Sequence, residues 1–288
     1  MAKPVIAVTG SNGQLGSELR GLQQLLPQYE WLFTSREELD LANREDIHVF
    51  FEKFRPEWFV NCAAYTAVDK AESEKEQALA ANAEAPETIA KECAETGTKL
   101  IHVSTDYVFR GDGEKPYAPD DTTNPVNFYG ETKRQGEQNA LRYNAQTIII
   151  RTSWVYSAHG KNFVKTMRKL MQSRTELNVV ADQKGSPTYA KDLAAAIVSI
   201  IQSPKQHWGI YHFSNSGELT WFDFAVEINR VSGFGCRIQP IPTADFPTPA
   251  RRPAYSVLDK SKLVRNYGIA LRDWKESLRE CIEILNKN

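Results

Sequence analysis

The sequence of 288 residues predicts an α/β fold with a doubly wound, Rossmann-like parallel sheet and a smaller α/β substrate lobe. Three observations support this prediction. The chain opens with an apolar strand, Pro4 to Thr9, that runs directly into a glycine-rich turn and a helical pattern. Short apolar runs and helical patterns then alternate, which is typical of βαβ units. A later strand, Lys99 to Tyr107, ends in hydroxyl and carboxyl groups, where open parallel sheets place their chemistry.

Length and composition limit the domain organisation and the partners. A chain this long exceeds a typical domain, so we expect a dinucleotide-binding domain at 1–156, completed by parts of 178–215, and a mainly substrate-binding lobe at 157–288. The apolar share of 41% and the charged share of 25% are ordinary for a globular protein. The formal net charge of -1 offers no basic face, which argues against a nucleic-acid partner.

The cysteines and the apolar runs indicate a reduced, cytoplasmic protein. The four cysteines are far apart and lack the pair spacing of metal sites, so we expect them to be reduced and mostly buried. The longest apolar stretch, Leu193 to Ile201, is too short to span a bilayer, and the N-terminal run is too short for a secretory signal. We therefore expect no membrane association.

The first strand and helix frame a loop suited to a dinucleotide. Apolar residues recur at helical spacing from Gly13 to Leu26. Gly10 permits the tight turn, Gly13 lets the backbone approach a phosphate, and Gly16 allows close packing of helix on strand. A glycine-rich turn without a ligand is the alternative interpretation. The expected cofactor contacts here are Gly10, Asn12, Gly13, Gln14, Leu15 and Gly16.

The second strand, Glu30 to Thr34, ends beside a residue that could select the cofactor. Ser35 and Arg36 follow it, where a dinucleotide fold meets the adenosine ribose. A carboxylate there would bind the ribose 2′-hydroxyl, whereas an arginine accommodates a 2′-phosphate. Arg36 therefore favours NADPH, with NADH tolerated, although a solvated loop arginine fits the pattern nearly as well.

Beyond a helix at 44–54, the third strand, Trp58 to Asn61, leads into small residues that would let a cofactor lie against the backbone. These expected contacts are Ala63, Ala64 and Tyr65. Ordinary tight packing is the alternative interpretation. A long helix at 76–96 then contains Asn82, which is either a cofactor-side contact or a tolerated polar residue.

The fourth strand and the next helix supply the candidate catalytic groups. Tyr129 and Lys133 stand four residues apart in a plausible helix start, so both leave the same helix face. An ammonium beside the phenol favours the phenolate and would bring the pKa of Tyr129 nearer neutrality, and it should also hold the nicotinamide ribose. The Thr105 hydroxyl can hydrogen-bond a substrate carbonyl oxygen while Tyr129 protonates that oxygen and a nicotinamide delivers hydride to the carbon.

The second half of the chain indicates helices and short strands of a binding lobe. A flap rich in Gly, Pro and Asp is expected at 111–124. The expected elements that follow are strands at 146–151, 177–180 and 209–213, helices at 163–172, 191–201 and 221–231, a polar loop at 182–188 and irregular chain at 240–253. Thr220 is expected to be the N-cap of the helix at 221–231. Within that irregular segment Arg251 and Arg252 suit a nucleotide diphosphate, or are solvated.

Several motifs resemble known enzymes. The G-x-x-G-x-x-G spacing resembles the extended short-chain dehydrogenase/reductase superfamily, and Asp40-Leu41 resembles its adenine-side contact. The segments that together resemble the dTDP-4-dehydrorhamnose reductase family are Ser104 to Phe109, Tyr129 to Lys133, Arg151 to Tyr156 and Pro247 to Pro253. The resemblance implies reduction of the C4 ketone of dTDP-4-dehydro-L-rhamnose by NADPH or NADH, giving dTDP-L-rhamnose for cell-surface polysaccharide. It also implies that Val68, Asp106 and Trp154 surround the deoxyhexose. With Thr105 and Arg252, these are the expected substrate contacts.

One departure from that family concerns a metal. In some relatives a divalent cation such as Mg²⁺ lies between the subunits of a homodimer, held by glutamates in the first helix and after a Pro-Thr dipeptide. Glu18 could supply the first ligand, but Pro187-Thr188 is followed by Lys191 and Asp192, and an ammonium cannot bind a hard cation. We therefore expect no metal site and do not assume the same dimer.

Two other classes of protein also contain the glycine loop and the Tyr/Lys pair or are built on the same fold. The first is another extended short-chain sugar-nucleotide enzyme, an epimerase or a 4,6-dehydratase. Dehydratases resemble one another in carrying Asp-Glu after the threonine, whereas this chain has Asp106-Tyr107. The second is a non-catalytic dinucleotide-binding regulatory subunit, which would have no need of Thr105, Tyr129 and Lys133 together.

Overall fold

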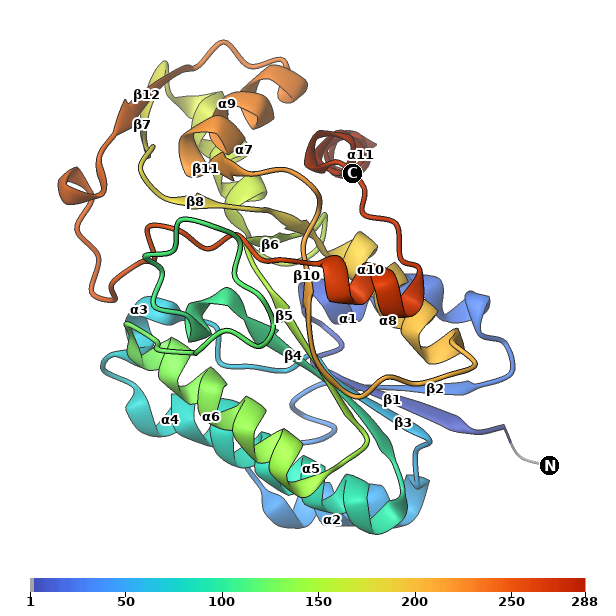
Figure 1. Cartoon of the computed structure of the whole chain (residues 1–288). Helices are drawn as coiled ribbons and strands as arrows, with labels where there is room; N and C mark the ends of the chain where they lie inside the picture. The colour runs from blue at the N-terminus through green and yellow to red at the C-terminus, as the bar shows by residue number, and fades with distance from the viewer. Residues whose placement is uncertain (1–2, 288) are drawn as a thin grey trace.

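The computed structural model describes residues 3–287, in which helices flank a central parallel sheet and a smaller lobe covers one end of it (Figure 1). In this part of the chain the main sheet has the strand order β10-β5-β4-β3-β1-β2, with every neighbouring pair parallel. Its strands are β1 (Val5–Thr9), β2 (Glu30–Thr34), β3 (Trp58–Asn61), β4 (Lys99–Thr105), β5 (Thr147–Thr152) and β10 (Gly209–Phe213). The doubly wound fold is confirmed.

The strands are apolar on both faces, so helices must cover both sides of the sheet. One side is packed by α1 (Gln14–Leu22), α8 (Ala190–Gln202) and α10 (Ser261–Tyr267). The other side is packed by α2 (Arg44–Phe54), α5 (Ala85–Thr96) and α6 (Phe128–Tyr143). The strand order reverses between β1 and β3, and sheets of this kind bind ligands in the crevice at such a point.

The predicted helix at 76–96 is continuous but not uniform. It consists of α4 (Lys75–Leu79), a π-helical turn at Ala80–Glu84 and then α5. A π turn within an α-helix carries one extra residue and is frequent near functional sites. Short segments elsewhere are α3 (Val68–Ala71) and 3-10 turns at Gln23–Leu25, Asp106–Val108 and Thr243–Asp245.

The smaller lobe has its own apolar core. Its helices are α7 (Phe163–Ser173), α9 (Trp221–Ser232) and α11 (Trp274–Lys287). Its strands are β6 (Val155–Tyr156), β7 (Glu176–Val180), β8 (Lys184–Gly185), β9 (Thr188–Tyr189), β11 (Leu219–Thr220) and β12 (Arg237–Ile241). Thr220 and Asp223 form a reciprocal capping box that starts α9, as expected from Thr220.

The prediction of irregular chain from residue 240 is wrong at its start. Pro240 and Ile241 belong to β12, which pairs in parallel with β7. Pro240 is tolerated because these two strands form a two-stranded sheet, so its missing N–H can face away from the partner. No helix between residues 3 and 287 is long and apolar enough to cross a membrane.

Candidate active site

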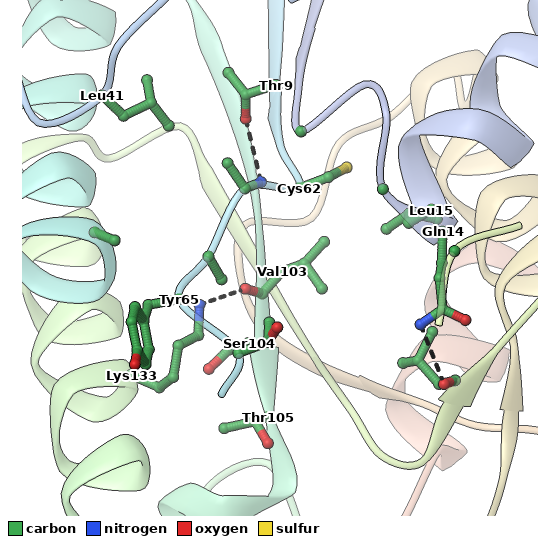
Figure 2. Close-up of a pocket in the computed structure, with 18 of the residues that line it drawn as sticks. Thr9, Gln14, Leu15, Leu41, Cys62, Tyr65, Val103, Ser104, Thr105 and Lys133 are labelled. Atoms are coloured by element: carbon green, nitrogen blue, oxygen red, sulfur yellow. Dashed lines mark hydrogen bonds between the residues drawn. The ribbon is translucent and has the colours of Figure 1, made fainter. Parts of the chain in front are cut away.

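A cavity of about 1250 Å³ opens where the carboxyl ends of the main-sheet strands meet the smaller lobe. Figure 2 shows the groups that β1, β3 and β4 direct toward it. The predicted residues that line it are Gly10, Asn12, Gly13, Gln14, Leu15, Arg36, Asp40, Leu41, Ala63, Ala64, Tyr65, Val68, Thr105, Asp106, Tyr129, Lys133 and Trp154. The fold therefore gathers the predicted cofactor and catalytic residues into one cavity. Four residues offered as candidate contacts lie outside its lining: Gly16, Asn82, Arg251 and Arg252.

The glycine loop has the shape that a dinucleotide phosphate requires. Gly10 has a φ of +65°, and a side chain there would meet the backbone of Cys62 and Ala63 at 3.0 Å. A Cβ on Gly16 would lie 2.4 Å from the Gly10 carbonyl oxygen, so Gly16 serves helix packing rather than lining. The first turn of α1 has no side-chain cap, which leaves its N–H groups for an anion. These residues fit a nicotinamide dinucleotide.

Arg36 lines the cavity just after β2. Its side chain is 86% exposed, and its Nε lies 3.8 Å from Asp40 Oδ1. Asp40 also accepts a hydrogen bond from the Ala42 N–H at 3.1 Å. An arginine with so few protein contacts can reorient toward a phosphate, whereas its pairing with Asp40 is weak because both groups are solvated.

Asn82 is neither a cofactor contact nor a merely tolerated polar residue. Its side chain is fully buried at the π turn, where Oδ1 accepts from the Tyr65 N–H at 2.9 Å and Nδ2 donates to the Tyr65 carbonyl at 3.0 Å. Nδ2 also reaches the Thr132 hydroxyl at 3.1 Å. Asn82 therefore ties the segment after β3 to helix α6, which carries Tyr129 and Lys133.

The start of α6 is fixed from three sides. Asn127 caps the helix by accepting from the Gly130 N–H at 2.8 Å, and its Nδ2 donates to the Arg251 carbonyl at 2.8 Å. The Phe128 N–H donates to Glu72 at 2.9 Å. A Cβ on Gly130 would lie 2.2 Å from the Tyr107 carbonyl oxygen, so only glycine lets α6 pack this closely. The predicted helix start is thus observed, and it holds Tyr129 in the cavity wall.

The expected lowering of the Tyr129 pKa is wrong for this structure. Burial raises the pKa of Tyr129, and the nearby Thr105 hydroxyl offsets only part of this effect. The Lys133 Nζ instead donates to the Val103 carbonyl at 2.9 Å, as Figure 2 shows, and lies 3.4 Å from His102 Nε2. Burial lowers the pKa of Lys133 to about 8. The phenol is therefore held in its protonated, donor form.

The Thr105 hydroxyl makes two hydrogen bonds within the protein in this structure. Its hydroxyl donates to Asp106 Oδ1 at 2.9 Å and accepts from the Tyr107 N–H at 3.2 Å. Asp106 is 3% exposed, its second oxygen has no partner among the described residues, and burial raises its pKa to about 6. The hydroxyl hydrogen must leave Asp106 before Thr105 can donate to a carbonyl oxygen.

Sequence reasoning missed a buried polar chain beneath Lys133. The Thr9 hydroxyl donates to Asn61 Oδ1 at 2.8 Å, and Asn61 Nδ2 lies 3.1 Å from His102 Nδ1. These residues come from β1, β3 and β4, three neighbouring strands. The available signal was a single polar residue at the end of β1 and of β3 and a histidine among the apolar residues of β4.

Trp154 lines the cavity next to the smaller lobe. This residue has a φ of +49°, which is strained for a tryptophan, and its ring stacks on Trp221 with centroids 3.6 Å apart. Gly185 lies so close that a Cβ there would meet the Trp154 ring at 2.7 Å. Trp221 was not predicted, because its sequence position indicated only a helix start.

Arg252 does not line the cavity. Its guanidinium pairs with Asp69 at 2.7 Å and lies 3.4 Å from the Ala250 carbonyl. Asp69 also accepts from the Ala250 N–H at 3.2 Å. In this structure Arg252 links the 247–253 segment to α3. The Arg252 guanidinium could bind a diphosphate only after its ion pair with Asp69 breaks.

The glutamate in the first helix has no cation-binding partners. Glu18 accepts from the Ser157 hydroxyl at 2.6 Å, while the Lys191 ammonium lies 2.6 Å from Glu280. Between residues 3 and 287, no cluster of three or more His, Cys, Asp or Glu side chains could hold a metal ion. Within the described residues of one subunit, these side chains do not form a divalent-cation site.

Comparisons with known proteins agree with this geometry. Residues 4–287 match the model of the RmlD substrate binding domain family. A dTDP-4-dehydrorhamnose reductase of Sinorhizobium fredii is 42% identical over 286 residues, covering 96% of each chain. A probable dTDP-4,6-dihydroxy-2-methyloxan-3-one 4-ketoreductase of Streptomyces antibioticus is 41% identical, covering 95% of this chain and 92% of its own. The crystal structure of dTDP-4-dehydrorhamnose reductase from Bacillus anthracis in complex with NADP is 37% identical with a TM-score of 0.93, covering 98% of this chain and 100% of its own.

Proposed function

The chain belongs to the dTDP-4-dehydrorhamnose reductase (RmlD) family, and on that premise we propose that it reduces the C4 ketone of dTDP-4-dehydro-L-rhamnose to dTDP-L-rhamnose. One observation carries the proposal: Thr105, Tyr129 and Lys133 line the same cavity as the glycine loop. A proton donor and a dinucleotide site that share one cavity are what carbonyl reduction needs.

In the proposed reduction each of these residues has a separate role. When bound, the reduced nicotinamide supplies the hydride. Tyr129 supplies the proton to the ketone oxygen, and its raised pKa keeps the phenol protonated until the oxygen becomes basic. Thr105 orients that oxygen once its hydroxyl turns away from Asp106. Lys133 holds the nicotinamide ribose, and Trp154 packs against the deoxyhexose.

The cofactor and the cellular location follow from the same premise. The Bacillus anthracis relative was crystallised with NADP, and Arg36 lines the cavity with a guanidinium that suits a 2′-phosphate, which supports NADPH as the proposed cofactor. Residues 1–156 with parts of 178–215 would bind it, and 157–288 would mainly bind the dTDP-sugar. We place this activity in the cytoplasm, where nucleotide sugars are made.

The test is turnover of dTDP-4-dehydro-L-rhamnose with NADPH, followed by loss of the reduced-nicotinamide absorbance and by NMR of the product. We expect one NADPH consumed per dTDP-L-rhamnose formed. An epimerase would convert substrate without net consumption of NADPH, and a regulatory subunit would bind NADPH without turnover. A higher kcat/KM for the 4-keto sugar of the Streptomyces relative would reassign the substrate within this enzyme class.

A further inference from the structure

A short loop of the smaller lobe, residues 157–162, lies against the start of helix α1, directly after the glycine loop. Asn162 Nδ2 donates to Oε1 of Gln14, a residue that lines the cavity (Figure 2), at 2.9 Å. One turn along α1, Glu18 accepts from the Ser157 hydroxyl at 2.6 Å. The loop is therefore bound to α1 at both of its ends.

The middle of this loop also comes close to α1. Gly160 has a φ of +65°, a conformation that favours glycine, and a Cβ there would lie 3.1 Å from Gln14 Cγ. Lys161 thus stands between Gly160 and Asn162, which both lie against Gln14. Gly160 and Lys161 line the same cavity as the glycine loop. The loop therefore places Lys161 in the cavity wall beside the first turn of α1.

The cavity has three cationic lining residues, Arg36, Lys133 and Lys161. Arg36 follows β2 and lies 3.8 Å from Asp40, whereas the Lys133 Nζ donates to the Val103 carbonyl at 2.9 Å. Lys161 is exposed and makes no ion pair within residues 3–287. The cation beside the glycine loop is therefore free to bind an anion.

The glycine loop itself carries no positively charged side chain. Residues 10–16 contain no lysine or arginine, so the N–H groups at the start of α1 offer only partial positive charge. A dinucleotide pyrophosphate is an anion on both of its phosphates. An ammonium from a neighbouring segment adds the full positive charge that the glycine loop lacks.

We propose that Lys161 binds the pyrophosphate of the nicotinamide dinucleotide from the side of the smaller lobe. The inference rests on the proposed dinucleotide cofactor, but not on which sugar is reduced. Since the glycine loop belongs to the main sheet domain, the bound dinucleotide then links the two parts of the chain. NADPH and NADH both contain the pyrophosphate, so Lys161 contributes equally to the binding of each.

The other charged residues around this loop do not take this role. Lys165, in the first turn of α7, donates to the Ala158 carbonyl at 3.1 Å. Glu18 already accepts a hydrogen bond from the loop. Lys165, His159 and Glu18 are all outside the cavity lining. Lys161 is thus the residue of this loop whose charge faces the site.

Isothermal titration of the full chain with NADPH and with NADH tests the proposal. We expect Lys161→Gln to weaken both by the same factor, about 3- to 10-fold at an ionic strength of about 0.01 M, because one charged contact is lost. This loss should shrink toward an ionic strength of about 1 M, where the Debye length is only about 3 Å. Lys161→Arg keeps the charge and should recover most of the affinity. An equal loss in Lys161→Arg and Lys161→Gln would overturn the proposal.

Lys169→Gln is the matched control, because Lys169 is an exposed lysine of α7 outside the cavity lining. It makes the same change in net charge and should bind both dinucleotides as the wild type does. A separate titration with dTDP distinguishes the two diphosphates: we expect Lys161→Gln to leave the Kd for dTDP unchanged, and a loss confined to dTDP would overturn the proposal.

The same titrations separate this inference from the proposed function. If Lys161→Gln bound NADPH and NADH as tightly as the wild type, the role of Lys161 would be refuted and the reductase would stand. If the wild type bound neither dinucleotide, the proposed function and this inference would both be refuted.

Discussion

The Thr105 hydroxyl donates to Asp106 Oδ1 at 2.9 Å, inside a cavity where Asp106 has almost no contact with solvent. The bond draws the hydroxyl hydrogen away from the position a ketone oxygen would take. Burial opposes the ionisation of the Asp106 carboxyl and raises its pKa to about 6, while the bond from Thr105 offsets part of this effect.

We expect Asp106→Asn to become more stable relative to the wild type as the pH rises. A carboxyl whose folded-state pKa exceeds its ordinary value opposes folding only when ionised. Below pH ~4 it is protonated in both states, the penalty builds between pH ~4 and ~6, and it is complete above pH ~6, reaching on the order of 2 kcal/mol. Thermal unfolding of both proteins across this range measures the difference.

Asp112→Asn is the matched control for this change, because Asp112 is 58% exposed and pairs with Arg110 on the surface. We expect its stability relative to the wild type to vary little with pH. If the free energies of unfolding of Asp106→Asn and the wild type differed by the same amount from pH 4 to pH 8, Asp106 would not be a buried carboxyl that ionises in this range.

Tyr129→Phe should retain NADPH binding and lose activity by a factor of ~100 or more, the usual effect of deleting a general acid. The ring packs edge-on against Tyr107, with centroids 5.6 Å apart, and phenylalanine preserves this contact. Stopped-flow hydride transfer and a fluorescence titration with NADPH separate rate from binding. Tyr143→Phe, at the far end of the same helix, is the control and should behave as the wild type. A near-normal kcat in Tyr129→Phe would show that Tyr129 is not the proton donor.

The sequence predicted the structural features that depend only on residues close together in the chain. The glycine loop, the Tyr129 and Lys133 spacing and the Thr220 cap depend on neighbours within one or two turns, so local spacing is enough to predict them. The Thr9, Asn61 and His102 chain depends on which strands are adjacent in the sheet, and no local pattern gives that order. The Trp154 and Trp221 stack likewise joins residues 67 positions apart.

Two predictions, on the helix around Asn82 and on the pKa of Tyr129, were wrong because contacts between distant segments decide both features. The alanine-rich pattern around Asn82 predicts an ordinary α-helix, but the bonds of Asn82 to the Tyr65 backbone favour a π turn there. The pKa of Tyr129 was expected to fall because Lys133 lies one turn away. In the structure Lys133 is directed at the Val103 carbonyl of β4, so desolvation dominates at the phenol.

Arg36→Ala should weaken NADPH binding about tenfold and change NADH binding less than about twofold. A charge-assisted contact to a phosphate is worth about 1.5 kcal/mol or more, and NADH lacks that phosphate. Isothermal titration with each cofactor gives the ratio. Arg44→Ala is the control, because Arg44 is an exposed arginine at the start of α2 and does not line the cavity. If the binding of NADPH and of NADH weakened equally, Arg36 would not contact the 2′-phosphate and would be a solvated loop residue.

Trp221→Ala should raise the KM for the sugar nucleotide by about 2- to 10-fold and leave the KM for NADPH unchanged. Stacking of this kind contributes about 0.5–1.5 kcal/mol, and it holds Trp154 in a backbone conformation that is otherwise strained. Steady-state kinetics with each substrate varied provide the measurement. Trp221→Phe should restore much of the loss, whereas Val226→Ala, on the exposed side of α9, should show none.

Chelation should leave the protein unaffected. The Lys191 ammonium pairs with Glu280 at 2.6 Å, and Arg272 bridges Glu280 and Asp192 at 2.7 and 2.9 Å, so these carboxylates are already neutralised by side chains. A cation held at a thousandfold excess over its Kd would stabilise the fold by about 4 kcal/mol, a shift of roughly 8 °C or more in Tm for a chain of this size. We expect EDTA and millimolar Mg²⁺ to give the same Tm and the same rate. A fall of several degrees with EDTA, restored by Mg²⁺, would show that the cation is bound by groups other than this paired cluster.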